Sequence, residues 1–247
     1  MSEPVVGVVG RGRLGTAVRD LARAEGHEVR VYASRALPDP RTETAPDVVV
    51  DCSAPAALTG VAELCHHWRR PLVQCVSGLD EQQQAVLGRL GRSVAVVAAP
   101  NLTLGNYLLS RAVRCVAEVV TTMARAGVTG AVPEAAVFER HPARKAHRPS
   151  TTAVQLSRLW TSLTEHEVSD VASLRAGDAV SDHELRLGWD GQSLALVHTV
   201  GSIRTAAAGA IGIAAAATSL PVGVHHAHDV FDQMLAVMGG DGGKDQR

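Results

Sequence analysis

The sequence lacks a large net charge, having a formal charge of −1, has few aromatic residues and contains no long apolar run. Its 24 Lys and Arg residues nearly balance 25 Asp and Glu residues, so charge favours neither nucleic acid nor an anionic membrane surface as a partner. The longest apolar stretch, residues 206–217, is too short and too rich in Ala and Gly to cross a bilayer. The N-terminus has no charged segment leading into an apolar one, as a secretory signal would. We therefore expect a cytoplasmic protein.

Cysteine and histidine form no recognisable metal-binding pattern. The four cysteines (Cys52, Cys65, Cys75 and Cys115) lack the spacing of a zinc site, and we expect reduced core thiols. Residues 225–229 hold three His and one Asp, but no partner cluster with zinc-like spacing accompanies them. His183 and His198 fall in predicted strands and are interpreted as structural, although either could face a pocket. We predict no metal site.

A glycine-rich stretch near the N-terminus carries the strongest functional signal. An apolar strand beginning at Val5 leads into Gly10-Arg-Gly-Arg-Leu-Gly15, and apolar residues then recur at helical spacing as far as Gly26. Gly10 would permit a tight turn, Gly12 would let a pyrophosphate approach the backbone, and Gly15 would let the helix pack on the strand. The helix N-terminus would attract the phosphates. We therefore predict a dinucleotide site, with an ordinary glycine turn as the alternative; its residues are Gly10, Gly12, Arg13, Leu14 and Gly15.

The segment after the second predicted strand, residues 28–33, indicates which dinucleotide binds. An NAD-specific site would place an Asp or Glu here to bind the ribose 2′-hydroxyl. This sequence has Ser34-Arg35 instead, and a hydroxyl with a guanidinium suits a 2′-phosphate. We predict NADPH as the cofactor, with NADH as the alternative. Arg35 as an ordinary solvated loop residue is the competing interpretation.

The order of elements indicates an α/β fold in two parts. Apolar strands at 47–51, 72–76 and 94–98 alternate with helices at 55–68 and 80–90, which predicts a Rossmann-type doubly wound parallel sheet. Ligands on such sheets bind at the carboxyl ends of the strands, where Ser53 and Ser77 lie.

After residue 101 the pattern changes to a helix at 102–125, a strand at 131–138, a helix from Ser150 and strands at 168–174, 183–189 and 193–199. These indicate a smaller α+β domain with an open mixed sheet. Helices at 204–217 and 226–238 follow.

A polar loop at residues 139–149, followed by a Ser-capped helix, is the second dense signal. The stretch from 139 to 152 holds two His, four cations and three hydroxyls. Lys145 could hold a carboxylate, and His141 could donate a proton near neutral pH. Ser150 opening a helix makes an anion site from a hydroxyl and backbone N–H groups. A solvated basic loop is the alternative.

This loop resembles the signature of the dihydrodipicolinate reductases, E-x-H-H-x-x-K-x-D-x-P-S-G-T-A. The matching residues are Glu139, His141, Lys145, Pro149, Ser150, Thr152 and Ala153. Similar segments lie in the same order over about 200 residues: Arg13-Leu-Gly15, Asp51-Cys-Ser-Ala-Pro55, Ala99-Pro-Asn-Leu-Thr-Leu-Gly105, Arg175-x-Gly177 with His183, and His198 with Arg204 and Gly209.

The resemblance implies a domain organisation and residue roles. Residues 1–103 and 204–247 would form the dinucleotide-binding domain, and residues 104–203 the substrate-binding and oligomerisation domain of a homotetramer. Hydride would pass to a small carboxylated cyclic imine or a conjugated C=C or C=N bond. His141 would donate the proton and Lys145 would assist the developing charge. The remaining implied ligands are Ser150, Thr151, Thr152 and Ser77 for the substrate, with Ser53, Ser77 and Asn101 joining the cofactor site.

Three departures from the signature concern the substrate pocket. Pro142 replaces the second His, His147 replaces an Asp, and Thr151 replaces a Gly. Pro142 removes an N–H donor, and Thr151 adds a Cβ beside the expected carboxylate site. A divergent reductase with the usual substrate of lysine biosynthesis fits this pattern. An imine reductase of specialised metabolism or a non-catalytic NADP-binding sensor are the alternatives.

Overall fold

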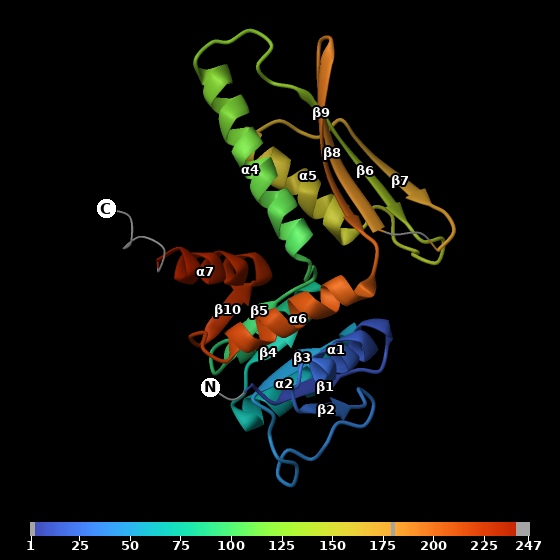
Figure 1. The fold of residues 1–247 in the computed structure, drawn as a ribbon, viewed down its shortest axis with the longest axis vertical. Helices are drawn as coiled ribbons and strands as arrows, with labels where there is room; N and C mark the ends of the chain where they lie inside the picture. The colour runs from blue at the N-terminus through green and yellow to red at the C-terminus, as the bar shows by residue number, and fades with distance from the viewer. Residues whose placement is uncertain (1–2, 179–180, 241–247) are drawn as a thin grey trace. The chain divides into compact units, whose positions relative to one another are not determined.

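The computed structural model describes residues 3–178 and 181–240 (Figure 1). By its internal contacts the chain divides into one unit of Met1–Thr103 and Ile203–Arg247 and another of Leu104–Ser202. None of the helices in the described ranges combines the length and the apolar composition needed to cross a membrane.

The first unit is built on a six-stranded parallel sheet in the order β10-β5-β4-β3-β1-β2. The chain passes from β1 to β2 and then crosses to β3 on the other side of β1, so the strand order reverses between β1 and β3. Such a reversal is where ligands bind on open α/β sheets. The predicted doubly wound parallel sheet is confirmed; its strands are β1 (Val6–Val9), β2 (Val29–Tyr32), β3 (Val48–Asp51), β4 (Leu72–Gln74), β5 (Ala95–Ala98) and β10 (Gly223–His226).

Helices cover both faces of this sheet. On one face α1 (Arg13–Ala24) packs against α6 (Ile203–Ala217), and α7 (Ala227–Gly240) packs against α6. On the other face a 3₁₀ turn, η1 (Pro55–Ala57), leads into α2 (Leu58–Trp68), which packs against α3 (Glu81–Leu90). Successive valines of one strand, such as Val8 and Val9, pack into the hydrophobic cores on opposite faces of the sheet. This burial on both faces explains the near-continuous apolar strands of the sequence.

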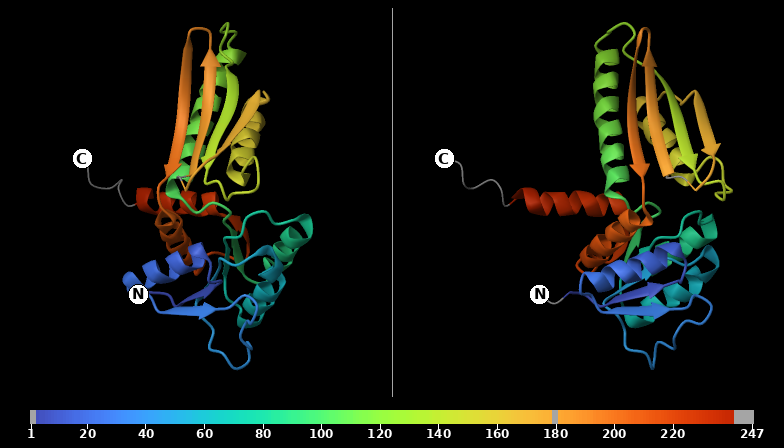
Figure 2. Two further views of the ribbon diagram at one scale, coloured as in Figure 1. Left: turned by 90° about the vertical axis from the view of Figure 1, so that its right-hand side faces the viewer. Right: turned by 45° about the vertical axis from the view of Figure 1, so that its right-hand side comes forward.

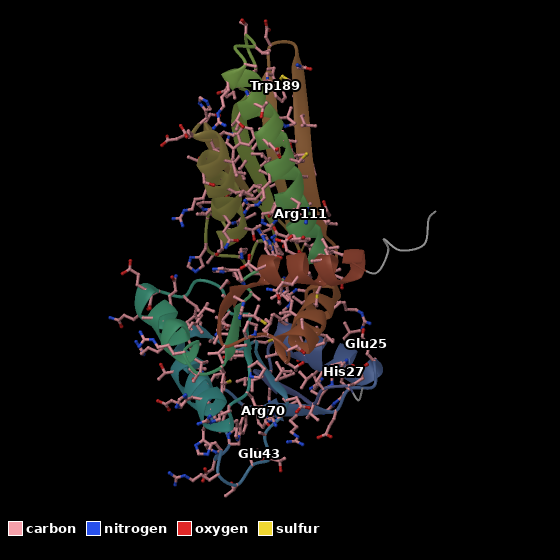
Figure 3. All side chains as sticks on the ribbon, turned by 90° about the vertical axis from the view of Figure 1, so that its left-hand side faces the viewer. Glu25, His27, Glu43, Arg70, Arg111 and Trp189 are labelled. Carbon is pink, nitrogen blue, oxygen red and sulfur yellow. The ribbon has the colours of Figure 1, made fainter. Side chains whose placement is uncertain are left out.

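The second unit is a four-stranded mixed sheet in the order β7-β6-β8-β9, in which β6 and β7 are parallel and the other pairs antiparallel. Helices α4 and α5 pack on one face (Figure 2), around the fully buried Trp160 and Leu185. At the turn joining β8 to β9, the Trp189 indole donates to the Ala131 carbonyl at 3.1 Å (Figure 3). The predicted open mixed sheet is confirmed; the elements are α4 (Leu104–Arg125), β6 (Glu134–His141), α5 (Thr151–Thr164), β7 (Asp170–Arg175), β8 (Ser181–Trp189) and β9 (Gln192–Val200).

The largest differences from the sequence prediction concern β6 and β10, whereas the bounds of most other elements shift by one or two residues. Strand β6 continues to His141, whereas the sequence predicts a loop from Glu139 onward. Because successive side chains of a strand alternate between faces, Glu139 and His141 both point toward the helices and are buried. Strand β10 was not predicted, because its four residues include two histidines and a glycine.

Candidate active site

The glycine loop joins β1 to α1 at the point where the strand order reverses. Gly10 has a φ of +104°, and a Cβ there would lie 2.7 Å from the Cys52 carbonyl oxygen. A Cβ at Gly15 would overlap the Gly10 carbonyl. Gly12 differs, because it is the N-cap of α1 in extended conformation and a Cβ there would meet no atom within 4 Å. Gly10 and Gly15 are therefore required by packing, whereas Gly12 leaves open space where a phosphate can approach the helix N-terminus.

This contrast separates folding from cofactor binding. Gly12→Ala should leave the thermal unfolding temperature nearly unchanged and weaken NADPH binding at least tenfold, because the new methyl group would occupy phosphate space. Gly15→Ala should lower both stability and affinity, because overpacking typically costs about 1–3 kcal/mol. Thermal unfolding and fluorescence titration with NADPH measure the two effects. Unchanged NADPH affinity in Gly12→Ala would contradict the prediction that this loop binds the phosphates.

Ser34 and Arg35 form the turn that follows β2. The Ala36 N–H donates to the Ala33 carbonyl at 3.0 Å, which closes the turn with Ser34 half-buried and Arg35 exposed. Arg11 and Arg13 are also exposed at the start of α1. Three guanidinium groups, those of Arg11, Arg13 and Arg35, thus follow the carboxyl ends of β1 and β2. The turn at Ser34 and Arg35 contains no carboxylate.

The loops after β3, β4 and β5 hold the other predicted cofactor residues. The backbone N–H and hydroxyl of Ser53 both donate to the buried Asp51 carboxylate, and the Gln74 side chain donates to it at 2.9 Å. Burial raises the pKa of Asp51 despite these hydrogen bonds. The Ser53 proton is thus directed to Asp51, which leaves its oxygen lone pairs to face a ligand. Ser77 lies exposed after β4, and the Asn101 side chain accepts from Thr103 after β5.

In the second unit the Glu139 carboxylate is the centre of a buried polar cluster. Arg175 donates to it at 2.7 Å, Ser173 at 2.6 Å and the Ser150 N–H at 3.0 and 3.1 Å. Its Oε2 atom also lies 3.3 Å from His141 Nε2. Burial alone would raise the pKa of Glu139, but the hydrogen bonds outweigh it and bring the pKa to about 2. Glu139 is therefore an acceptor-only carboxylate at neutral pH.

Arg175 ties the predicted loop to this cluster. Besides Glu139, its guanidinium donates to the Lys145 carbonyl at 3.1 Å and to the His147 carbonyl at 2.7 Å. The side chain is 2% exposed. The buried Arg175 side chain on β7 thus holds the backbone on both sides of residue 146. These hydrogen bonds fix the backbone position from which the Lys145 side chain extends.

Two histidines meet beside Glu139. His141 Nε2 lies 3.2 Å from His183 Nε2, which in turn lies 3.2 Å from Ser150 Oγ. Burial is the main cause that lowers the pKa of His141, with Lys145 adding to the effect. Burial and the neighbouring His141 lower the pKa of His183 to about 4. His183 is consequently neutral at physiological pH.

The N-terminus of α5 completes the site. Ser150 caps the helix, its Oγ accepting from the Ala153 N–H at 3.2 Å. Thr151 is exposed and Thr152 half-buried in the first turn, and Lys145 is half-buried in the preceding loop. The structure thus joins Ser150 and His141 in one network, with Lys145 close enough to depress the pKa of both histidines.

The nitrogen atoms of His141 and His183 and a Glu139 oxygen lie within 4.8 Å of one another, a spacing that a metal ion could bridge. The surroundings oppose a cation, because Arg175 already contacts the carboxylate and Lys145 repels positive charge from both histidines. We interpret the three groups as a hydrogen-bonded cluster, and the absence of a metal stays a prediction.

The sequence predicts no role for Ser173, and Glu139 and Arg175 enter only as matches to the family pattern. His183 also matches that pattern and is interpreted as structural, with a pocket as the alternative. The structure places all four side chains in this cluster. The available signal was the two-residue spacing of Glu139 and His141, which places both on one face of a strand. This spacing does not by itself predict a strand, because the polar run after Phe138 is typical of a loop.

Comparison with known proteins gives a consistent result over most of the chain. The family model described as "Dihydrodipicolinate reductase, N-terminus" matches residues 5–102, and "Dihydrodipicolinate reductase, C-terminus" matches residues 112–231. The 4-hydroxy-tetrahydrodipicolinate reductase of Halorhodospira halophila is 30% identical over 211 residues, covering 78% of this chain and 76% of that protein. The enzyme of the same name from Xanthomonas euvesicatoria is 30% identical over 186 residues, covering 74% and 72%.

Solved structures agree in fold. A dipicolinate-bound dihydrodipicolinate reductase from Paenisporosarcina sp. TG-14 superposes with a TM-score of 0.69 at 14% identity, covering 91% of this chain and 98% of that one. An amine dehydrogenase from Mycobacterium smegmatis gives a TM-score of 0.55 at 12% identity, covering 92% and 96%. At these identities the likeness concerns the fold alone.

Proposed function

The chain belongs to the dihydrodipicolinate reductase family, and from that premise we propose that it reduces a small cyclic imine, or a conjugated carboxylate of the same kind, at the expense of NADPH. It is an NAD(P)H-dependent oxidoreductase. The observation that carries the substrate assignment is the buried Glu139–His141–Ser150 cluster, which lies beside Lys145 and the N-terminus of a 14-residue helix. These groups combine a proton source with two binding elements for negative charge.

The first unit supplies the cofactor site. The loop at Gly10, Gly12 and Gly15 would hold the pyrophosphate, because Gly12 keeps open space in front of the α1 N-terminus. Arg35, with Ser34, would bind a 2′-phosphate. Ser53, Ser77 and Asn101, on the loops after β3, β4 and β5, would line the nicotinamide end. When bound, the reduced nicotinamide supplies a hydride to the electrophilic carbon of the substrate.

The second unit supplies substrate binding and the proton. Lys145 would bind one substrate carboxylate and stabilise the negative charge that develops during reduction. Ser150, Thr151 and Thr152 would bind a carboxylate through hydroxyl groups and first-turn N–H groups. His141 would transfer a proton to the atom that gains the electron pair of the double bond. Hydride and proton together account for both hydrogens added.

The open face of the second sheet supports self-association. Phe138, Leu174 and Val197 point to the face opposite α4 and α5 and are 39%, 45% and 56% exposed. We propose that this face joins copies of the chain into a homo-oligomer, as the resemblance implies with a tetramer.

The function is tested by following NADPH absorbance with freshly prepared 4-hydroxy-tetrahydrodipicolinate, with NADPH affinity measured separately by fluorescence. We expect substrate-dependent oxidation of NADPH. Tight NADPH binding without turnover of this compound would contradict the assignment. Screening other cyclic imino acids would then separate an imine reductase on a different substrate, which Pro142 and Thr151 would favour, from an NADP-binding sensor.

Arg35→Ala should weaken NADPH binding about tenfold and change NADH binding little, because one charge-assisted contact to the 2′-phosphate is lost. Arg92→Ala is the matched control, since this exposed arginine lies before the amino end of β5, which three strands separate from β2 in the sheet. Fluorescence titration of both cofactors measures the effect. Equal weakening of NADPH and NADH would exclude Arg35 from 2′-phosphate binding.

A further inference from the structure

The two ring nitrogens of His141 have different surroundings. Nε2 points into the buried cluster, 3.3 Å from Glu139 Oε2 and 3.2 Å from His183 Nε2. The side chain of Glu139 is fully buried, and that of His141 is 7% exposed. Nδ1 takes no part in these contacts, so it is the nitrogen left to face a ligand.

Counting protons in the cluster assigns the donors. Glu139 is ionised and can only accept, so its contact with His141 requires a proton on Nε2. Ser150 Oγ accepts from the Ala153 N–H, which leaves its hydroxyl proton available for His183 Nε2 or for the Glu139 carboxylate. The contacts around Glu139 are therefore satisfied when His141 carries a proton on Nε2.

We propose that Glu139 is a positioning residue that holds His141 through Nε2–H, so that the transferable proton is carried by Nδ1. The inference rests on the proposed function, in which His141 is the proton donor. Before transfer His141 is an imidazolium whose Nε2–H points at a carboxylate. After transfer from Nδ1 it is the neutral Nε2–H tautomer, and the Glu139 contact is unchanged. The imidazole need not rotate during the reaction.

The charges around His141 give Glu139 a second effect. Lys145 on the loop and Arg175 on β7 oppose the imidazolium, as does burial, whereas Glu139 on β6 favours it. On the β8 side His141 faces His183, which lies opposite His198 of β9; on the α5 side Ser150 is uncharged. Removing the Glu139 charge should therefore lower the pKa of His141 further. The substrate carboxylates would raise it when they bind.

The proposal is tested by NMR of protein labelled with ¹⁵N-histidine, with His141 assigned from a His141→Asn sample. In the unaltered protein, the neutral form of His141 should be protonated on Nε2. A dominant Nδ1–H tautomer would overturn the proposal without any variant being needed. This measurement does not depend on turnover, so it fails or succeeds separately from the proposed reaction.

Glu139→Gln should lower the pKa of His141 by about 1 or more, because an opposite charge within about 4–6 Å is removed. The alkaline limb of the pH profile of kcat/KM, where His141 loses the proton that it donates, should move to lower pH by the same amount. Glu139→Asp, which keeps the charge, should restore part of both shifts. Ser173→Ala is the matched control, since it removes a neutral contact to Glu139 and should leave the tautomer unchanged. An unshifted His141 pKa in folded Glu139→Gln would contradict the proposal.

Discussion

Replacing Arg175 by alanine should lower the free energy of unfolding of the second unit by about 3–5 kcal/mol. The reason is that Arg175 is the buried cation that pairs with Glu139, and its removal leaves an ionised carboxylate buried without a counter-charge. The variant also loses the hydrogen bonds to the Lys145 and His147 carbonyls, so the loop loses its attachment to β7. Urea unfolding at neutral pH measures the change.

The matched control is Arg144→Ala. Arg144 forms an ion pair with Asp178 on the surface, with side-chain exposures of 51% and 90%, and such pairs contribute little. Equal effects of the two substitutions would show that burial of the Glu139–Arg175 pair does not matter.

The same pair predicts an acid-sensitive stability. The pKa of Glu139 is about 2 in the folded protein, below the roughly 4.3 of an unperturbed Glu, so this group stabilises the fold above the unfolded pKa. By linkage the contribution is roughly 3 kcal/mol near neutral pH and is lost as pH falls from about 5 toward 2. Glu139→Gln should flatten this part of the stability profile. An unchanged acid limb would contradict the assignment of the low pKa.

Lys145→Ala should lower kcat by about 10²- to 10³-fold, the usual cost of losing one group that stabilises transition-state charge. NADPH affinity should stay near the wild-type value, because Lys145 belongs to the second unit and the predicted phosphate contacts belong to the first. Steady-state kinetics and fluorescence titration measure the two quantities. Arg144→Ala, which removes the neighbouring exposed cation, should leave kcat nearly unchanged.

A different outcome would reassign the loop. If Lys145→Ala abolished NADPH binding and left kcat at saturating cofactor unchanged, the loop would be a cofactor-binding element. If Arg144→Ala matched Lys145→Ala, the loop would act through its overall positive charge.

Local signals predicted most of the fold because they reflect interactions between residues near in sequence. Asp80 forms a capping box with Gln83, as expected of an acidic residue before a helix. Gly191 has a φ of +74° in the turn between β8 and β9, where Asp190-Gly191 predicts a hairpin. The valine-rich runs became the buried parallel strands.

The parts that could not be predicted depend on distant partners. A glutamate in an apolar face is not expected of a strand, and Glu139 is tolerated there only because Ser173 and Arg175, 34 and 36 residues away, donate to it. The residue types in the polar loop indicate His141 and Lys145 as candidates, and the family signature then implies a role for each. Their roles, and those of the cofactor ligands, stay predictions.

The most direct test of the central claim is transfer of deuterium from NADPH labelled at the reactive C4 position. Mass spectrometry of the reduced product formed from 4-hydroxy-tetrahydrodipicolinate should show one deuterium on carbon from the correct C4 stereoisomer of the cofactor. In a separate reaction run in D2O, deuterium from the solvent should enter the product through the proton donor. A product without cofactor deuterium, or no reduced product under conditions where NADPH binds, would contradict the proposal that this chain is an NADPH-dependent reductase of that substrate.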